Sequence, residues 1–121
     1  MKLRIRGNSI RLRLNQTEVT NLGKQIAVEE KTDFGNENFL VYSVVPTDKA
    51  DKVTAEFQNG RIEIYLPIQT ARSWAESEEV GISAEHGELK LLIEKDFACL
   101  APRNPEEDTD AFPHPKSEKF C

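Results

Sequence analysis

Alternation of polar and apolar residues runs through most of this 121-residue chain, and it limits the possible folds more than any other feature. An alternating segment places its apolar side chains on one face of a strand, so the pattern indicates half-buried β-strands. Turns that contain glycine join these strands in pairs, and Asn59-Gly60 is the strongest hairpin signal among them. The predicted strands cover residues 2–6, 10–14, 25–31, 38–45, 53–57, 61–66, 80–84 and 88–95.

Two short helices are predicted between the hairpins. Asn15 stands three residues before Glu18, which is the spacing of a capping box, and Gly23 can end that helix in the left-handed conformation. The second helix is expected to begin at Pro67, whose fixed φ suits the first helical position. Trp74 lies on the apolar stripe of this helix, so we expect it to be buried in the core.

The order strand, strand, helix, strand, strand occurs twice. A shift of 52 residues aligns the two copies, so that Ile10 falls on Ile62 and Leu22 on Trp74. Chance is the competing explanation, because any two hairpins share a period of two. A half this small cannot bury a core alone. The prediction is a mainly β fold with two short helices, a compact β-barrel or sandwich from two pseudo-symmetric ββαββ halves at about residues 1–46 and 52–96.

The length corresponds to one domain, and the composition changes near its end. Residues 1–100 are predicted to form a single β-rich domain. Residues 101–121 are rich in proline and acidic side chains, so we expect a solvated tail. Phe112 or Phe120 could pin this tail to the domain, where it could cover an edge strand.

Several classes of protein are disfavoured by the sequence. It has no run of about 20 apolar residues, which a membrane span needs, and its first residues lack the hydrophobic block of a secretory signal. We therefore expect a soluble, cytoplasmic protein. Its two cysteines, Cys99 and Cys121, are too few for a disulfide scaffold, and a reducing cytoplasm opposes a bond between them.

Two resemblances to known families follow from these residues. Asn59 to Pro67, with the short helix and hairpin that come after, resembles the AbrB-type swapped-hairpin barrel, which pairs two chains. That resemblance implies a DNA-binding regulator, although Glu56 and Glu63 stand where such regulators carry a basic strand. The whole chain, especially residues 6–11 and 93–97, resembles a family of small uncharacterised bacterial proteins. This second resemblance implies a bacterial cytoplasmic origin and carries no known activity.

The first 14 residues hold five cations and no acidic residue. The apolar pattern of the first hairpin places Arg4 opposite Arg11, and such like-charged pairs destabilise neighbouring strands. Something anionic should therefore lie over this face. It is either a set of carboxylates of the same chain or an external phosphate, nucleic acid or acidic partner. The candidate anion-binding residues are Lys2, Arg4, Arg6, Arg11 and Arg13.

The 52-residue shift favours internal carboxylates, because it aligns Arg4 with Glu56 and Arg11 with Glu63. We therefore expect Glu56, Glu63 or other carboxylates of the same chain near Arg4 and Arg11, with solvent screening the remaining charge. Nucleic acid is the least favoured external partner, since the net charge is −5 and no aromatic stacking platform is visible.

Metal and catalytic sites are not predicted. Asp96, Cys99, His114 and Cys121 could ligate zinc, but they lack the closely spaced Cys or His pairs of a zinc site, so no cofactor is expected. No nucleophile motif or glycine-rich phosphate loop occurs, and His86 falls in a turn. The leading hypothesis is a small non-enzymatic binding or accessory protein. The alternatives are an AbrB-like DNA-binding regulator and an enzyme with a cleft between the two halves.

Overall fold

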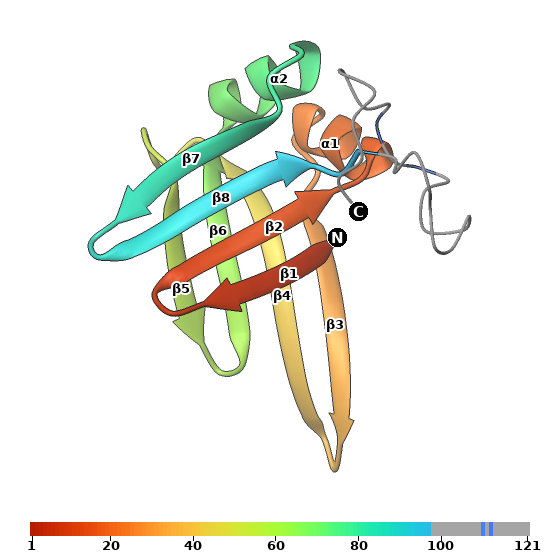
Figure 1. The fold of residues 1–121 in the computed structure, drawn as a ribbon, viewed down its shortest axis with the longest axis vertical. Coiled ribbons are helices and arrows are strands. Elements are labelled where there is room, and N and C mark those ends of the chain that lie inside the picture. The colour runs from red at the N-terminus through yellow and green to blue at the C-terminus, as the bar shows by residue number, and fades with distance from the viewer. Residues whose placement is uncertain (98–109, 111, 113–121) are drawn as a thin grey trace.

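The computed structural model describes residues 1–97, 110 and 112, and it shows two four-stranded sheets packed as a sandwich, with their strands crossing (Figure 1). Sheet A has the strand order β1 (Lys2–Arg6), β2 (Ser9–Leu14), β8 (Leu89–Lys95), β7 (Gly81–His86). Sheet B has the order β3 (Val28–Gly35), β4 (Asn38–Thr47), β6 (Arg61–Pro67), β5 (Thr54–Gln58). The predicted mainly β fold is confirmed, and of the two architectures considered the structure has the sandwich.

Two helices, α1 (Gln16–Gly23) and α2 (Ile68–Glu76), pack against each other at one end of the sandwich (Figure 1). The predicted capping box is present, because the Asn15 side chain accepts from the Glu18 N–H at 2.9 Å. In return the Glu18 carboxylate accepts from the Asn15 N–H at 3.0 Å. These reciprocal bonds satisfy amide groups that a helix start otherwise leaves unpaired.

The end of α1 differs from the prediction. Gly23 is helical, and Gln25 takes the left-handed conformation at φ 65° instead. The Ile26 N–H then reaches the carbonyl of Asn21 and the Gln25 N–H reaches that of Leu22, which is a Schellman motif. This turn occupies the residues where the third strand was expected to begin, so β3 starts only at Val28.

The need for glycine at position 23 comes from packing between the helices. A Cβ atom on Gly23 would lie 2.7 Å from the Cβ of Ala75 on α2. Carbon atoms do not approach this closely, so glycine lets the two helices come near each other.

The central strand pairs are parallel and join distant parts of the chain. β2 pairs with β8 and β4 pairs with β6, so each sheet combines one hairpin from each predicted half. The 52-residue shift matches β1 with β5, β2 with β6, β3 with β7 and β4 with β8. When each strand of sheet A is replaced by its match, the result is the order of sheet B, counted from the other edge. A duplication would give this order, and the duplication itself stays a prediction.

The core lies between the sheets and beneath the helices. Trp74 is 1% exposed, which confirms its predicted burial, and its helix packs against both β4 and β6. β4 belongs to the first predicted half and β6 to the second. The other large side chains with almost no exposure are Leu12, Leu14, Leu22, Ile64, Leu66, Ile93 and Val44.

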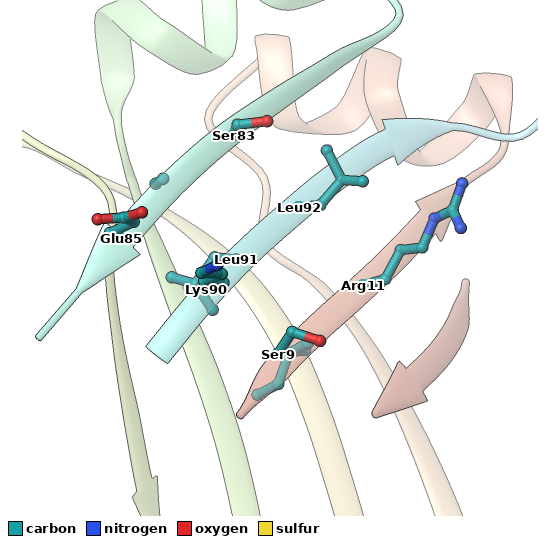
Figure 2. A pocket seen from close by; sticks show the side chains of 9 residues that line it. Ser9, Arg11, Ser83, Glu85, Lys90, Leu91 and Leu92 are labelled. Carbon is teal, nitrogen blue, oxygen red and sulfur yellow. The ribbon is translucent and has the colours of Figure 1, made fainter. Parts of the chain in front are cut away.

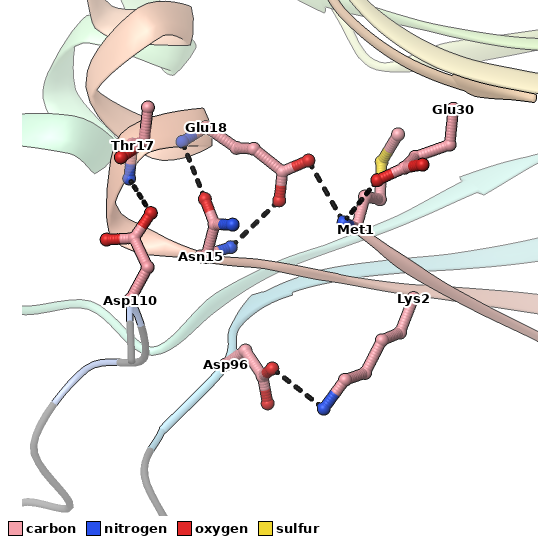
Figure 3. Close-up of polar contacts among 8 residues, drawn as sticks. All are labelled: Met1, Lys2, Asn15, Thr17, Glu18, Glu30, Asp96 and Asp110. Atoms are coloured by element: carbon pink, nitrogen blue, oxygen red, sulfur yellow. Dashed lines mark hydrogen bonds and ion pairs between the residues drawn. The ribbon is translucent and has the colours of Figure 1, made fainter. Parts of the chain in front are cut away.

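Two described residues of the tail dock beside α1. Figure 3 shows Asp110 at the start of this helix, where its carboxylate accepts from the Thr17 N–H at 3.1 Å. The Phe112 N–H donates to the Asp96 carbonyl at 2.7 Å, and its ring packs edge-on against Phe97. The predicted anchor at Phe112 is confirmed, at the end of β8 rather than along an edge strand. Phe120 lies outside the described residues.

Within the described residues, no helix is long and apolar enough to span a membrane.

Candidate functional site

The five predicted cations lie on the outer face of sheet A. The predicted register is confirmed, with Arg4 opposite Arg11 and Lys2 opposite Arg13. Leu12 and Leu14 of β2 have no exposed surface, so the residues that alternate with them point outward. Parallel pairing places Lys90 of β8 beside Ser9, which extends the charge across the sheet. We call this surface the basic face, made of Lys2, Arg4, Arg6, Arg11, Arg13 and Lys90.

Four of these cations surround one hollow, which we call the cationic hollow. It has a volume of about 190 Å³ and lies over β1 and β2. Leu3 completes its lining, and no carboxylate of the described residues takes part. Arg6 lies on the same face but outside the lining. The cations that line the hollow are Lys2, Arg4, Arg11 and Arg13.

A larger and shallower groove of about 670 Å³ lies beside the hollow on the same face. Figure 2 shows its side chains on β7, β8 and β2. Leu92 lies between the charged pair Glu85 and Lys90 on one side and Arg11 on the other. Arg11 lines both the groove and the hollow, so the two form one continuous surface. The polar side chains of the groove are Ser9, Arg11, Ser83, Glu85 and Lys90.

Part of the positive charge is neutralised within the chain. One oxygen of Glu94 accepts from Nε of Arg11 at 2.6 Å and from Nε of Arg13 at 2.7 Å. Lys2 pairs with Asp96 at 3.0 Å (Figure 3). Arg4 and Arg6 have no carboxylate within ion-pair distance among the described residues. The cations of the basic face thus outnumber the carboxylates on it.

The expected carboxylate of the same chain is present at Arg11, where it is Glu94, but the two residues named for this role, Glu56 and Glu63, were wrong. They face each other across β5 and β6, on the outer face of sheet B. The 52-residue shift pairs equivalent positions, and in this topology equivalent hairpins belong to different sheets. The outer faces of two packed sheets point in opposite directions, so Glu56 cannot reach Arg4.

A family model matches residues 1–116 of the chain, and the family is described as one of unknown function, DUF7009. The chain belongs to this family. No curated protein and no solved structure matches it. The resemblance to a family of uncharacterised proteins is thereby confirmed. The bacterial origin, the AbrB resemblance and the cytoplasmic location stay predictions.

In this DUF7009 chain, sequence reasoning missed Lys90 and Glu94. Both lie on β8, about 80 residues from β2, and parallel pairing alone brings the two strands together. The apolar alternation of residues 89–95 predicted the strand and gave no sign of its neighbour.

Lys95 is a second charged residue that the sequence did not single out. It is 5% exposed, and its ammonium donates to the Ser77 carbonyl at 2.7 Å. Burial lowers the pKa of this ammonium, and the nearby carboxylates Glu78 and Glu79 partly oppose that change. Lys95 thus connects β8 to the end of α2, at a position that pairs with the buried Leu14.

The other candidate residues have structural partners or lie outside the described residues. Nδ1 of His86 accepts from the Ala55 N–H at 2.9 Å, which connects β7 to β5. Within residues 1–97, 110 and 112, no three His, Cys, Asp or Glu side chains gather closely enough to hold a metal. Cys99, His114 and Cys121 fall outside these residues, so the absence of a metal site stays a prediction.

Acid should weaken this DUF7009 fold in part through Glu94. Burial alone would raise the pKa of its carboxyl, but the hydrogen bonds from Arg11 and Arg13 outweigh burial, so the pKa is lowered. A carboxyl with a lowered folded-state pKa contributes stability above its ordinary value of 4.5, and the contribution disappears as the pH falls through the folded-state pKa. We expect the difference in unfolding free energy between the parent chain and Glu94→Gln to shrink steadily below pH 4.5. Urea unfolding of both proteins from neutral to acid pH measures it, and a constant difference would contradict it.

Proposed function

We propose that this chain is a non-enzymatic binding protein that holds an oxyanion, such as a phosphate group of a ligand or partner, in the cationic hollow. The observation that carries the proposal is the lining of the hollow, which among the described residues consists of four cations and Leu3 with no carboxylate. Of these cations, Arg11 and Arg13 share a single carboxylate and Arg4 has none among the described residues.

Electrostatics favours an anion at this place. Like charges on neighbouring strands repel each other, and an anion between them lowers the free energy of the folded state. Arginine suits an oxyanion because its guanidinium presents several N–H donors in one plane. Arg11 and Arg13 contact Glu94 through Nε, and these two hydrogen bonds leave the terminal nitrogens of both guanidiniums available as donors.

The surroundings of the hollow favour a compact anionic group over a nucleic acid. Proteins that bind single strands combine a basic groove with aromatic side chains on which bases stack. No aromatic residue lines the hollow or the groove beside it in the described structure. The net charge of −5 also opposes the approach of a long polyanion.

A binding role also fits the chemistry of the lining better than catalysis. Cationic side chains hold an anion firmly in place, whereas catalysis needs a nucleophile or a base beside the bound group. Among the described residues, Ser9 and Ser83 of the groove have no histidine beside them in its lining.

A phosphate titration tests the proposal. A ligand that binds only the folded state stabilises it by an amount that grows with the logarithm of the ligand concentration, about 2.7 kcal/mol at a hundred times its Kd. We expect the melting temperature of the parent chain to rise with inorganic phosphate and further with pyrophosphate. In the double variant Arg4→Gln, Arg11→Gln this rise should be lost.

The matched control is the double variant Lys24→Gln, Lys49→Gln. It removes the same two charges from exposed positions away from the hollow. The control should respond to phosphate as the parent does. Equal responses from all three proteins would show that the hollow binds no anion.

A further inference from the structure

Among the edge strands of the sandwich, β1, β3 and β5 each leave one large apolar side chain in water, but Phe34 of β3 lies at a break in the register with β4. β1 ends sheet A and β5 ends sheet B. Ile5 on β1 is 56% exposed and Phe57 on β5 is 71% exposed. Both lie on the inner side of their strand, because Ile5 pairs with Ile10 and Phe57 with the buried Ile62. Each sheet therefore has an apolar end that its own chain leaves uncovered in the described structure.

The backbone at these two residues points toward the open edge. In β5, the Ala55 N–H reaches His86 on β7, so the backbone groups of Ala55 face away from β6. Backbone groups alternate along a strand in an antiparallel pair, so those of Phe57 face the same way. β1 belongs to the same kind of hairpin, with a two-residue turn after Arg6 as β5 has after Gln58. The backbone groups of Ile5 therefore also face the edge.

Charges of opposite sign flank the two apolar residues on the outer side. Arg6 follows Ile5, and Glu56 precedes Phe57. Neither Arg6 nor Glu56 forms an ion pair among the described residues. The two edges thus match in three respects: each offers free backbone groups, an exposed apolar side chain and one of two complementary charges.

We propose that β1 of one molecule pairs with β5 of a second copy of this chain. Antiparallel pairing with Ile5 opposite Phe57 places Arg6 opposite Glu56, so the apolar and the charged pairs form together. Parallel pairing would instead place β1 alongside Ala55, whose N–H already donates to His86. The contact joins sheet A of one molecule to sheet B of the next, and it does not depend on an anion in the cationic hollow.

Such a contact uses two different surfaces, so it is heterologous. An open assembly keeps one free β1 at one end and one free β5 at the other until a ring closes. The average mass should therefore rise with concentration beyond that of a dimer. High salt should weaken the contact, because the pair between Arg6 and Glu56 lies on the outer side near solvent.

Two blocking variants test this inference by sedimentation velocity over a concentration series. Ile5→Lys removes the β1 surface and Phe57→Lys removes the β5 surface, at positions exposed enough to tolerate lysine. Each variant alone should remain monomeric. An equimolar mixture should form dimers and nothing larger, because one variant supplies β5 and the other supplies β1. Phe34→Lys is the matched control, because Phe34 is 68% exposed and lies on β3, and it should assemble as the parent does.

Three results would overturn the inference. The first is a parent chain that stays monomeric at all concentrations. The second is a Phe57→Lys variant that still assembles while Ile5→Lys does not, which would indicate a symmetric contact between two β1 strands. The third is a mixture of the blocking variants that forms no dimer. Phosphate binding by the monomeric Ile5→Lys variant separates this inference from the proposed function, since it should persist whether or not the parent assembles.

Discussion

Replacing Trp74 with alanine should lower the free energy of unfolding by about 3–5 kcal/mol. Trp74 is 1% exposed, and its helix packs against α1, β4 and β6. Alanine would leave a large cavity where these elements meet, and a packed interior closes such a cavity only in part. Small domains have about 5–15 kcal/mol of total stability, so the variant should be partly unfolded under mild conditions. Urea unfolding followed by circular dichroism measures the change, because the variant has no tryptophan fluorescence.

A milder substitution at the same position provides the control. The Trp74 indole N–H has no hydrogen-bond partner in the described structure, so Trp74→Phe loses packing volume without breaking such a bond. It should cost less than Trp74→Ala. A loss below about 1 kcal/mol in the alanine variant, typical of an exposed site, would contradict the packing described for α2.

Replacing Gly23 with alanine should destabilise the protein by about 1–3 kcal/mol, as overpacking does. The sign of the change in stability is informative, because alanine within a helix ordinarily stabilises a protein by about 1 kcal/mol relative to glycine. Here the new Cβ would lie 2.7 Å from the Cβ of Ala75, and neither methyl group can rotate away. The helices would have to separate, and this movement would also disturb the packing of both helices over the sheets.

A double variant isolates this contact. Ala75→Gly removes the atom that the new methyl group would meet, so Gly23→Ala should cost less in that background than in the parent. Chemical unfolding of the four proteins gives the coupling free energy between the two positions. If Gly23→Ala stabilises the parent chain, the close approach of α1 and α2 is wrong.

Local features of the fold were predictable from the sequence because they depend on residues close together in the chain. The pairing of Arg4 with Arg11 follows from apolar alternation on both sides of a two-residue turn, and the capping box follows from the spacing of Asn15 and Glu18. The end of α1 was mispredicted by two residues. Gly23 is required by a contact with α2 that the local sequence does not reveal, and Gln25 makes the turn.

The candidate site was predicted in part for the same reason. Its five cations lie within one hairpin and could be read from alternation. Glu94, which neutralises two of them, comes from a strand more than 80 residues away. A repeat in the sequence reveals which positions are equivalent, but it does not reveal which strands become neighbours. That gap led to Glu56 and Glu63 as the expected partners, and it also hid Lys90.

The parallel contact between β2 and β8 also has a consequence for the order in which the molecule can form. β2 ends at Leu14, and its neighbour begins only at Leu89, so the ribosome must make most of the chain before sheet A can be completed. Until then the first hairpin can pair only with itself, and the edge of β2 that binds β8 stays open. Contacts of such long sequence separation form slowly, because a long loop must close before they become favourable. Folding of this chain should therefore be limited by the arrival of β8, the last of the described strands, at a sheet that β1 and β2 began.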